Sequence, residues 1–430
     1  MPSIARRRLR ATLGLSAAIC GAVALCIAGP SAARAASACT STSLAQADSA
    51  GSCWTPFAGA PVFNTRLSTD PPLAPDNAAV QDHMVKYGWT IGWDPHQFSI
   101  GPGSRPVFYG TPSDPVMTIH CTSSEGPGTC QGQNGTDING VRINVPAGAR
   151  PDGNGDAHMT IIETANGDEY DLWHASVSGS TITAGTGAET NVGTGTGTGS
   201  GGDAANLALS AGLLRPSELM SGHIDHALVI VVPCTDATGF HVGYTWPATG
   251  GWGQACGQGV AEDPSTAPEL GQLLRLDMTP AQIAASGAPA WEQTIMTALA
   301  DYGAYIEDTG GLARQMSLIA ESPSSWTDLG RPDQWAEAAR MFGEHGDTLT
   351  SDVPIPTGDL QVVDTCVTRG TCPDNGNPVA HAASAHARRH GRHVRRHARH
   401  DRRHARRRHR HERGAVARLS RWRVVVGRRA

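Results

Sequence analysis

A histidine, a tyrosine and a carboxylate occur close together in the sequence, after a glycine-rich turn. His158 opens one expected strand, and Tyr170 and Asp171 lie in the next. Side chains alternate along a strand, so Tyr170 and Asp171 face opposite sides. Such groups on adjacent strands could line a groove of the size of a sugar ring, with the His or Tyr as a base. The structural alternative makes His158 an ordinary hydrogen-bonded strand residue and assigns the aspartates before it to the turn.

A second group of ionisable residues precedes an uninterrupted apolar run at residues 227–232. Arg215 lies in a helical turn, and His226 stands at the start of the buried strand that the run predicts. His223, Asp225 and His226 could supply a base, an orienting carboxylate or metal ligands, because a loop at the end of a buried strand is held rigidly. In the structural alternative, Asp225 caps the turn and His226 donates one hydrogen bond.

A third candidate is Asp308, which follows Glu307 at the exit of a short expected strand. It could be the second carboxylate that glycoside chemistry requires. A turn formed by Asp308-Thr-Gly-Gly is the structural alternative. Asp-Thr-Gly also occurs in aspartic proteases, but their chemistry needs two such elements. The sequence holds no second copy, so this class is excluded.

The candidate residues fall into two sets. The catalytic candidates are His158, His226, Tyr170, Asp171 and Asp308. The substrate-binding candidates are Arg215, Trp173, His223, Asp225 and Trp246. The tryptophans are included because exposed aromatic faces stack on sugar rings, although burial is the more common outcome for any single one.

Many short strands and few helices must position these residues. Apolar runs between Gly, Pro, Asn and Asp clusters predict strands at Val107–Tyr109, Val116–Cys121, Val141–Val145, His158–Glu163, Glu169–Ala175, Ala227–Val232, Phe240–Trp246 and Leu270–Leu276. Helices are expected after Pro289 and Pro332. The pattern predicts a mainly β fold, a β-sandwich or jelly roll with a few added helices. A Gly-Thr run at residues 193–202 predicts a mobile loop or linker, and it lacks the Gly-Lys-Ser/Thr ending of a nucleotide-binding loop.

The formal net charge of −5 hides three different regions. Residues 1–35 carry five Arg and no acid, then an apolar run and Ala-Arg-Ala, as in a secretory signal peptide. Residues 380–430 hold 18 Arg against two acids, which leaves 11 basic and 37 acidic residues elsewhere, or about −26. Such an acidic body is not expected to bind nucleic acid by itself. The Arg/His-rich tail cannot bury enough apolar surface to fold, so we expect it to be disordered and to bind polyanions.

These regions predict four parts of the chain: a signal peptide at 1–35, an N-terminal strap at 36–60, a β-rich domain at 61–375 and a tail at 376–430. No segment after the signal is apolar enough to cross a bilayer. We therefore expect a secreted protein, extracellular or associated with the cell wall. The sequence identifies no cofactor and assigns no metal, although His158, His223 or His226 with Asp225 remains an open alternative as a metal site.

Eight of the ten cysteines follow the predicted signal peptide. They form four close sequential pairs, Cys39–Cys53, Cys121–Cys130, Cys234–Cys256 and Cys366–Cys372. An even number in an exported chain favours disulfides, and proximity favours these four among the 105 possible pairings. None of the pairs has Cys-x-x-Cys spacing, so a structural zinc site is not expected.

Several short motifs between about residues 50 and 320 resemble a group of exported actinobacterial proteins of unassigned function. They include Trp54-Thr-Pro-Phe, Gly-Asp-Ala-His158-Met, Tyr170-Asp-Leu-Trp173, Ala-Gly-Leu-Leu-Arg215, Gly-His-Ile-Asp-His226 and Tyr302-Gly-Ala-Tyr305. This resemblance implies no catalytic residue. Polysaccharide lyases of the jelly-roll and sandwich types are similar only at the level of fold, because their signature peptides are absent.

The leading hypothesis is a secreted carbohydrate-active protein, a polysaccharide lyase or glycoside hydrolase acting on a wall glycan. In a lyase, His or Tyr would remove a proton beside a uronate carboxylate that Arg215 neutralises. In a hydrolase, two carboxylates would flank the scissile bond. The acidic body is less suited to a polyuronate, since like charges repel. The alternative is a non-catalytic, lectin-like module that binds a polysaccharide or cell-wall polymer and needs no converging acid and base.

Overall fold

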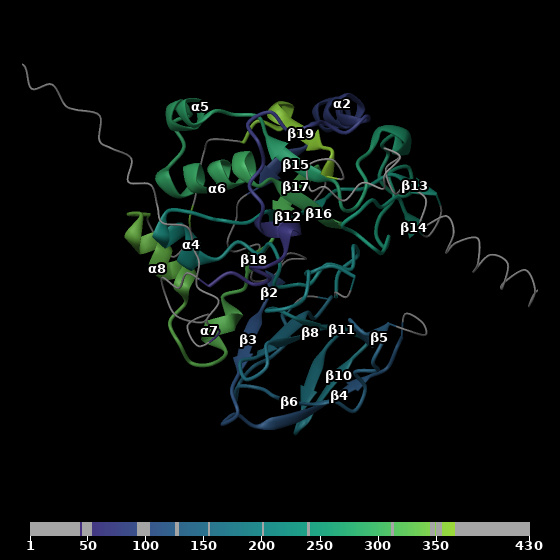
Figure 1. The fold of residues 1–430 in the computed structure, drawn as a ribbon, viewed down its shortest axis with the longest axis vertical. Coiled ribbons are helices and arrows are strands. Elements are labelled where there is room, and N and C mark those ends of the chain that lie inside the picture. The colour runs from purple at the N-terminus through teal and green to yellow at the C-terminus, as the bar shows by residue number, and fades with distance from the viewer. Residues whose placement is uncertain are drawn as a thin grey trace, which may run out of the picture. The chain divides into compact units, whose positions relative to one another are not determined.

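The computed structural model describes the central part of the chain (Figure 1). The described residues are Leu44, 54–92, 104–124, 129–153, 155–199, 202–238, 241–310, 314–344, Leu349 and 355–365. The predicted signal peptide, most of the predicted strap and the predicted tail lie outside them. The predicted pairs Cys39–Cys53 and Cys366–Cys372 also lie outside them.

Strands arranged in several sheets dominate the described structure, and the helices are few and short, so the predicted mainly β class is confirmed. The largest sheet is mixed and has six strands, in the spatial order β1 (Thr90–Gly92), β17 (Gln315–Leu318), β12 (Leu228–Val232), β16 (Ala304–Thr309), β15 (Leu273–Leu276) and β19 (Leu360–Val363). Its centre is β12, the apolar run seen in the sequence, and every residue of β12 is buried. It pairs in parallel with β16 and antiparallel with β17.

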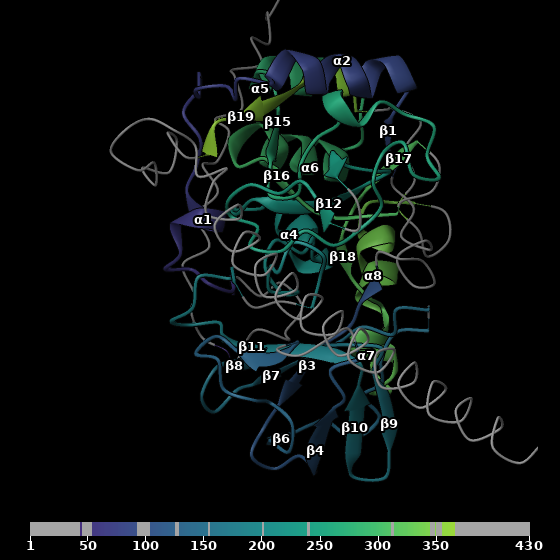
Figure 2. The same ribbon diagram turned by 90° about the vertical axis from the view of Figure 1, so that its right-hand side faces the viewer.

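Helices pack around this sheet and complete the larger core (Figure 2). They are α1 (Pro61–Asn64), α2 (Asn77–Tyr87), α4 (Pro216–Ser221), α5 (Pro280–Ala285), α6 (Ala290–Asp301), α7 (Ser324–Thr327) and α8 (Gln334–Met341), with short 3-10 turns η2 (Pro264–Thr266) and η3 (Thr357–Asp359). Helix α6 follows Pro289, as expected, and buries Trp291, Ile295 and Leu299 on one side against β15. Helix α8 begins after Asp333, whose carboxylate caps the backbone N–H of Trp335.

Two further sheets lie face to face and form a β-sandwich (Figure 1). One has the order β6 (Arg142–Asn144), β4 (Val116–Cys121), β10 (Thr181–Ala184) and β9 (Ser176–Ser178). The other has the order β3 (Val107–Gly110), β7 (Met159–Glu163), β8 (Asp168–Trp173), β11 (Thr186–Asn191) and β5 (Cys130–Gly132). Their facing sides enclose a second core that contains Ile119, Ile161 and Leu172. The disulfide Cys121–Cys130 joins the two sheets.

Small elements connect these layers. Strands β13 (Ala237–Thr238) and β14 (His241–Val242) form a hairpin, and β18 (Ala320–Glu321) pairs in parallel with β2 (Ser104–Arg105). The Gly-Thr run, expected as a mobile loop or linker, follows β11, and its residue Gly197 packs against Phe63 and Phe57. Only glycine fits there, because its φ is +72° and a Cβ would come within 3.0 Å of the Phe63 ring.

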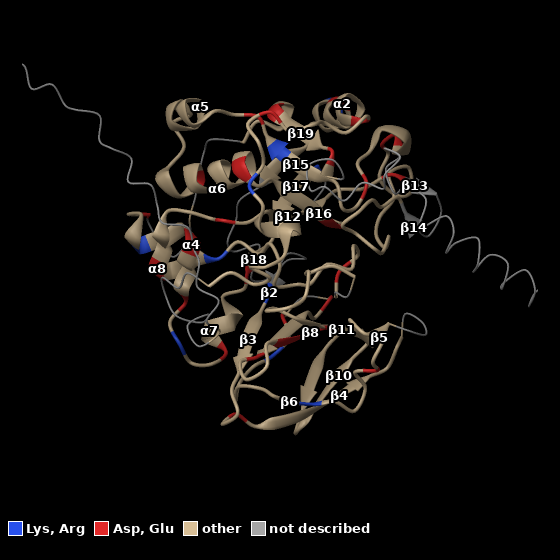
Figure 3. Cartoon of the chain, viewed as in Figure 1, with Lys and Arg blue, Asp and Glu red and all other residues tan. Residues whose placement is uncertain are grey.

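Acidic side chains outnumber basic ones over the described elements, in keeping with the charge of this region of the sequence (Figure 3). The second of the two described disulfides, Cys234–Cys256, ties the chain after β12 to a later loop. Both disulfides are pairings predicted from sequence proximity. Among the described residues, no helix has the length and apolar character needed to cross a membrane.

Candidate active site

The face of the five-stranded sheet that points away from the sandwich core borders a cleft of about 600 Å³. Strands β5, β8 and β11 and the turns beside β5 supply part of the lining. The rest comes from the loop before β7, from Gly199 and residues between 202 and 206, from the turn at 252–253 and from the end of β16. The lining side chains that could take part in catalysis or stack on a ligand are Asp156, His158, Trp173, Asp203, Trp252 and Asp308. The cleft therefore brings together His158, Trp173 and Asp308, three of the residues proposed from the sequence.

Backbone pairing places His158 and Trp173 at one end of adjacent strands. Met159 pairs with Leu172, so the residues just outside this pair, His158 and Trp173, lie at the same edge. The loop before β7 is held by its own polar contacts: the Asp152 N–H donates to the His158 carbonyl at 2.9 Å, and the His158 N–H donates to the Asp152 carboxylate at 3.2 Å. Asp152 therefore positions His158 through its backbone.

A β-bulge directs two acids to the end of β16. Ile306 pairs with Ile230 and Asp308 with Val231, so Glu307 is an extra residue that interrupts the alternation. Glu307 is 1% exposed, and its Oε1 lies 3.4 Å from Nη2 of Arg105, which is also buried. Asp308 is only half-buried and lines the cleft. The bulge thus presents one acid to a buried arginine and its neighbour to the cleft.

The environment of Asp308 changes its acidity. Desolvation, with smaller contributions from the negative charges of Glu307 and Asp156, raises the pKa of Asp308, and the resulting value is about 7. Arg105 and the N–H of Thr309, which donates to Oδ1 at 2.6 Å, act in the opposite direction. Burial, Glu307 and Asp308 also raise the pKa of Asp203 well above its usual range. Asp308 can therefore hold a proton near neutral pH and give it up, which is the property a general acid needs.

His158 is buried beside this acid cluster, with 3% of its surface exposed. Desolvation, followed by the charges of Arg105 and His174, lowers its pKa well below the usual range, so the ring is neutral at neutral pH. Its Nδ1 has no hydrogen-bond partner among the residues that the structure describes. A buried polar atom without a protein partner is unusual, because such atoms are nearly always hydrogen-bonded.

Two tryptophans give the cleft aromatic surfaces. Trp173 is half-buried and its ring stacks on that of His174, with the centroids 3.3 Å apart. Trp252 is 47% exposed, which is unusual for so large an apolar side chain. Aromatic rings that are held at the edge of a cleft can stack on the apolar faces of sugar rings.

Tyr170 and Asp171, two of the catalytic candidates, do not line the cleft. Tyr170 packs in the sandwich core on the other side of the sheet, and burial raises its pKa above the usual range. Asp171 is on the cleft side but is fully hydrogen-bonded, because its carboxylate accepts from Oγ1 of Thr160 and the N–H of Leu209, both at 2.9 Å. It therefore attaches the loop at residue 209 to the sheet.

The second group of candidates forms a separate buried network. Nε2 of His226 lies 2.7 Å from Oε1 of Glu218, and Nδ1 lies 2.9 Å from the Ala227 carbonyl. Arg215 donates from Nη2 to the Ser210 carbonyl at 2.7 Å. Burial alone would raise the pKa of Glu218, but the charges and hydrogen bonds of His226 and Arg215 hold it below the usual value. None of these residues lines the cleft.

The remaining substrate-binding candidates also lie elsewhere. Nδ1 of His223 is 3.4 Å from Oδ2 of Asp225, in a partly exposed pair after α4. Trp246 packs at the margin of the larger core, and its carbonyl accepts from Thr365. Asp203 was not among the candidates from the sequence, and Asp156 appeared there only among the aspartates before His158, which the structural alternative assigns to the turn. Trp252 was not singled out. Asp203 and Trp252 meet His158 and Asp308 only through long-range packing, which leaves no local signal in the sequence.

We expect the substitution His226→Ala to lower stability rather than catalysis. Removing one partner of a buried ion pair leaves the other without compensation, which costs about 3 kcal/mol. Urea unfolding at pH 7 measures this loss, and His223→Ala, in the partly exposed pair, serves as the matched control with a change below about 0.5 kcal/mol. Normal stability with lost turnover in His226→Ala would instead make His226 a catalytic residue.

Comparison of the chain with family models, with curated proteins and with solved structures finds no match.

Proposed function

We propose that the chain is a glycoside hydrolase that cleaves a neutral or amino-substituted wall glycan in this cleft. The observation that carries the proposal is Asp308, whose pKa is about 7, in one cleft with a second carboxylate, Asp156. Glycoside hydrolysis uses two carboxyl groups, one of which must be protonated at the working pH. Asp308 is assigned as the acid that protonates the leaving oxygen, and Asp156 as the partner that acts as base or nucleophile.

The cleft favours hydrolysis over the lyase reaction. A lyase needs a cation that neutralises the uronate carboxylate, and none of the described lining residues is Lys or Arg. Arg215 and Tyr170, the residues considered for that chemistry, do not line the cleft. The chemically reactive lining is acidic, so a polyuronate would be repelled whereas a neutral or amino sugar would not.

The direct test is incubation of the full chain with neutral, amino-substituted and uronate polysaccharides. New reducing ends without an ultraviolet-absorbing product support hydrolysis, and an unsaturated product that absorbs in the ultraviolet would establish a lyase. The anomeric configuration of the first product assigns Asp156 as nucleophile, if retained, or as base, if inverted.

The two tryptophans also fit the second candidate function, a non-catalytic glycan-binding module. Saturable binding of a polysaccharide without any cleavage would favour that function. Under either function, we propose that the chain acts outside the cell. The two described disulfides are compatible with an oxidising compartment. The Arg/His-rich segment at 376–430 remains a predicted site for anionic polymers.

We expect Trp252→Ala to weaken glycan binding about tenfold, as a rise in KM or Kd. Loss of one stacked ring removes about 0.5–1.5 kcal/mol in addition to the apolar area it covers. Isothermal titration with the best polysaccharide measures the change. Met341→Ala, at an equally exposed residue of α8 outside the cleft lining, is the control and should bind normally. Equal affinity of the two variants would remove Trp252 from the binding site.

A further inference from the structure

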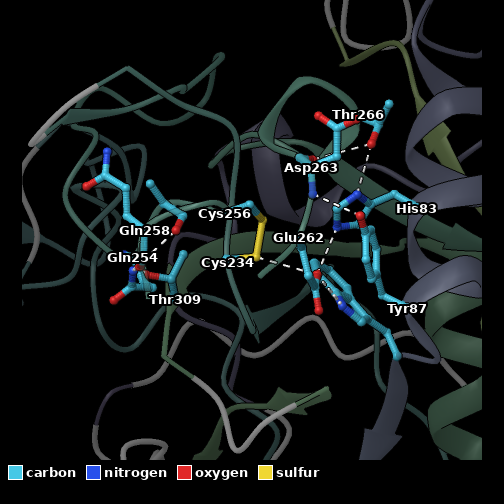
Figure 4. Close-up of a disulfide and its surroundings, with 12 residues drawn as sticks. His83, Tyr87, Cys234, Gln254, Cys256, Gln258, Glu262, Asp263, Thr266 and Thr309 are labelled. Carbon is cyan, nitrogen blue, oxygen red and sulfur yellow. Dashed lines mark hydrogen bonds and ion pairs between the residues drawn. A yellow bond between two sulfur atoms is a disulfide. The ribbon is translucent and has the colours of Figure 1, made fainter. Parts of the chain in front are cut away.

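Four buried donor side chains converge beside the larger core (Figure 4). They are His83, Cys234, Cys256 and Glu262, with 1%, 0%, 2% and 9% of their surfaces exposed. One potential ligand atom from each, namely a ring nitrogen, two sulfurs and a carboxylate oxygen, all lie within 4.8 Å of one another. Donor atoms of these types gathered within this distance could surround one metal ion.

Backbone contacts hold the two cysteines together independently of their S–S bond. The Cys256 N–H donates to the Thr235 carbonyl at 2.9 Å, and the Thr235 N–H donates to the Gln254 carbonyl at 3.1 Å. A further bridge pairs Cys256 with Val260, shortly before Glu262. His83 reaches the cluster from α2, which packs near η2. Backbone contacts therefore position the four donors in addition to the disulfide.

Hydrogen bonding orients the His83 ring for ligation. Its Nδ1 lies 3.0 Å from Oγ1 of Thr266, and that hydroxyl donates to the Asp263 carbonyl at 3.4 Å. This contact fixes the orientation of the His83 ring through Nδ1 and leaves Nε2 facing the other three donors. Nε2 lies within hydrogen-bond distance of Oε2 of Glu262, at 3.1 Å, so a cation bound between them would take the place of the proton that they share. Metal-binding histidines are typically held by an outer hydrogen bond of this kind.

The Glu262 carboxylate is also held by a group outside the four donors. Trp89 donates from Nε1 to Oε2 of Glu262 at 3.0 Å, and Sγ of Cys234 lies 3.6 Å from the same oxygen. The carboxylate is therefore fixed between the indole, the imidazole and the sulfurs. Figure 4 shows Glu262 beside Cys234 and His83. An outer donor to a ligating carboxylate is the second feature expected of a built metal site.

From this arrangement we propose that reduction of the Cys234–Cys256 disulfide creates a buried site for one zinc-like divalent cation, bound by both cysteines, His83 and Glu262. A disulfide sulfur is a poor ligand, whereas two thiolates, one imidazole and one carboxylate form a set that zinc prefers. With a phosphine as reductant, the S–S bond breaks, water supplies the oxygen of the phosphine oxide, and two thiols form. Both thiols release their protons when the cation binds.

The test uses the full chain, reduced with a phosphine, freed of reductant without oxygen and titrated with Co²⁺ or Zn²⁺. The expected result is one additional metal ion per chain over the oxidised protein, with the thiolate-to-cobalt charge-transfer band and the visible bands of a tetrahedral site. The oxidised protein is the baseline, because it includes any metal held by the histidine-rich tail. An identical metal content and spectrum in both states would overturn the proposal.

Variants then identify the ligands. Cys121→Ser/Cys130→Ser, which removes the other described disulfide, should keep the additional ion, whereas Cys234→Ser/Cys256→Ser should lose it. The variants Glu262→Gln and Thr266→Ala keep both cysteines. If the Cys234–Cys256 disulfide forms when these variants are oxidised, the variants are folded. They should weaken binding at least tenfold. A charge-transfer band that persists in Cys234→Ser/Cys256→Ser, or full affinity in Glu262→Gln, would place the metal elsewhere.

Discussion

Replacement of Asp308 by Asn is expected to lower kcat about 1,000-fold while leaving the protein folded. General acid catalysis contributes about 10²- to 10⁴-fold, and an amide of the same shape cannot donate the required proton. In the wild-type protein, kcat/KM should fall as the pH rises through about 7, where Asp308 loses its proton. The pH profile of the residual activity in Asp308→Asn should lack this alkaline limb.

The Asp308→Asn variant, although less active, should be more stable than the wild-type protein at alkaline pH. The pKa of Asp308 is about 7 in the folded chain against an ordinary value of 3.8, so the folded state retains a proton that the unfolded state has released. Below about pH 4 both states are protonated and Asp308 carries no penalty; the penalty grows as the pH rises and is complete above about 7. Asp308→Asn should therefore have a higher Tm than the wild-type protein at pH 8 and a similar Tm at pH 4.

Asp301→Asn is the matched control for these measurements. Asp301 ends α6 and pairs at 2.6 Å with the exposed Arg66, so its substitution should alter neither kcat nor the alkaline limb. Wild-type turnover in Asp308→Asn, with the alkaline limb still at about pH 7, would show that another group supplies the proton.

The substitution Arg105→Met is expected to affect both activity and stability. Arg105 is buried against Glu307, and its charge lowers the pKa values of Glu307 and Asp308. Without it, the pKa of Asp308 should rise, so the alkaline limb of kcat/KM should move to higher pH. At pH 8 the acids would remain buried without their cation, which should cost about 3–5 kcal/mol of unfolding free energy. At pH 5, where more of them are protonated, the loss should be smaller.

Urea unfolding and pH–rate profiles of Arg105→Met test both consequences. Arg66→Met removes an arginine whose side chain is 66% exposed, so its cost should stay below about 1 kcal/mol at either pH. Arg105→Lys retains the charge and should keep the alkaline limb near its wild-type position. If the alkaline limb of kcat/KM stays at the same pH in Arg105→Met, the titration of Asp308 does not produce that limb, whatever the loss of stability.

The sequence by itself determined the elements whose signals are local. The apolar run at 227–232 predicted the buried strand β12, and Pro289 predicted the start of helix α6. Disulfides 121–130 and 234–256 were predicted from proximity, because chain segments so close in sequence meet easily. Strand limits were less accurate: the run expected at 240–246 contributes only β14. Local patterns indicate which side of a helix or strand is buried. This information is sufficient to predict the fold class and the type of each element.

The tertiary structure alone decided which polar residues form a site. His158 and Asp308 were recognisable singly, but their shared cleft joins elements about 150 residues apart, which no local spacing encodes. The bulge at Glu307 and the partners Asp203 and Trp252 depend on that packing. Conversely, His226 resembled a catalytic residue in the sequence, yet it lies in a buried pair with Glu218. Residue type limits the chemistry that a side chain can perform. Long-range contacts set its burial, its neighbouring charges and its access to a cleft, and these determine which of that chemistry is available.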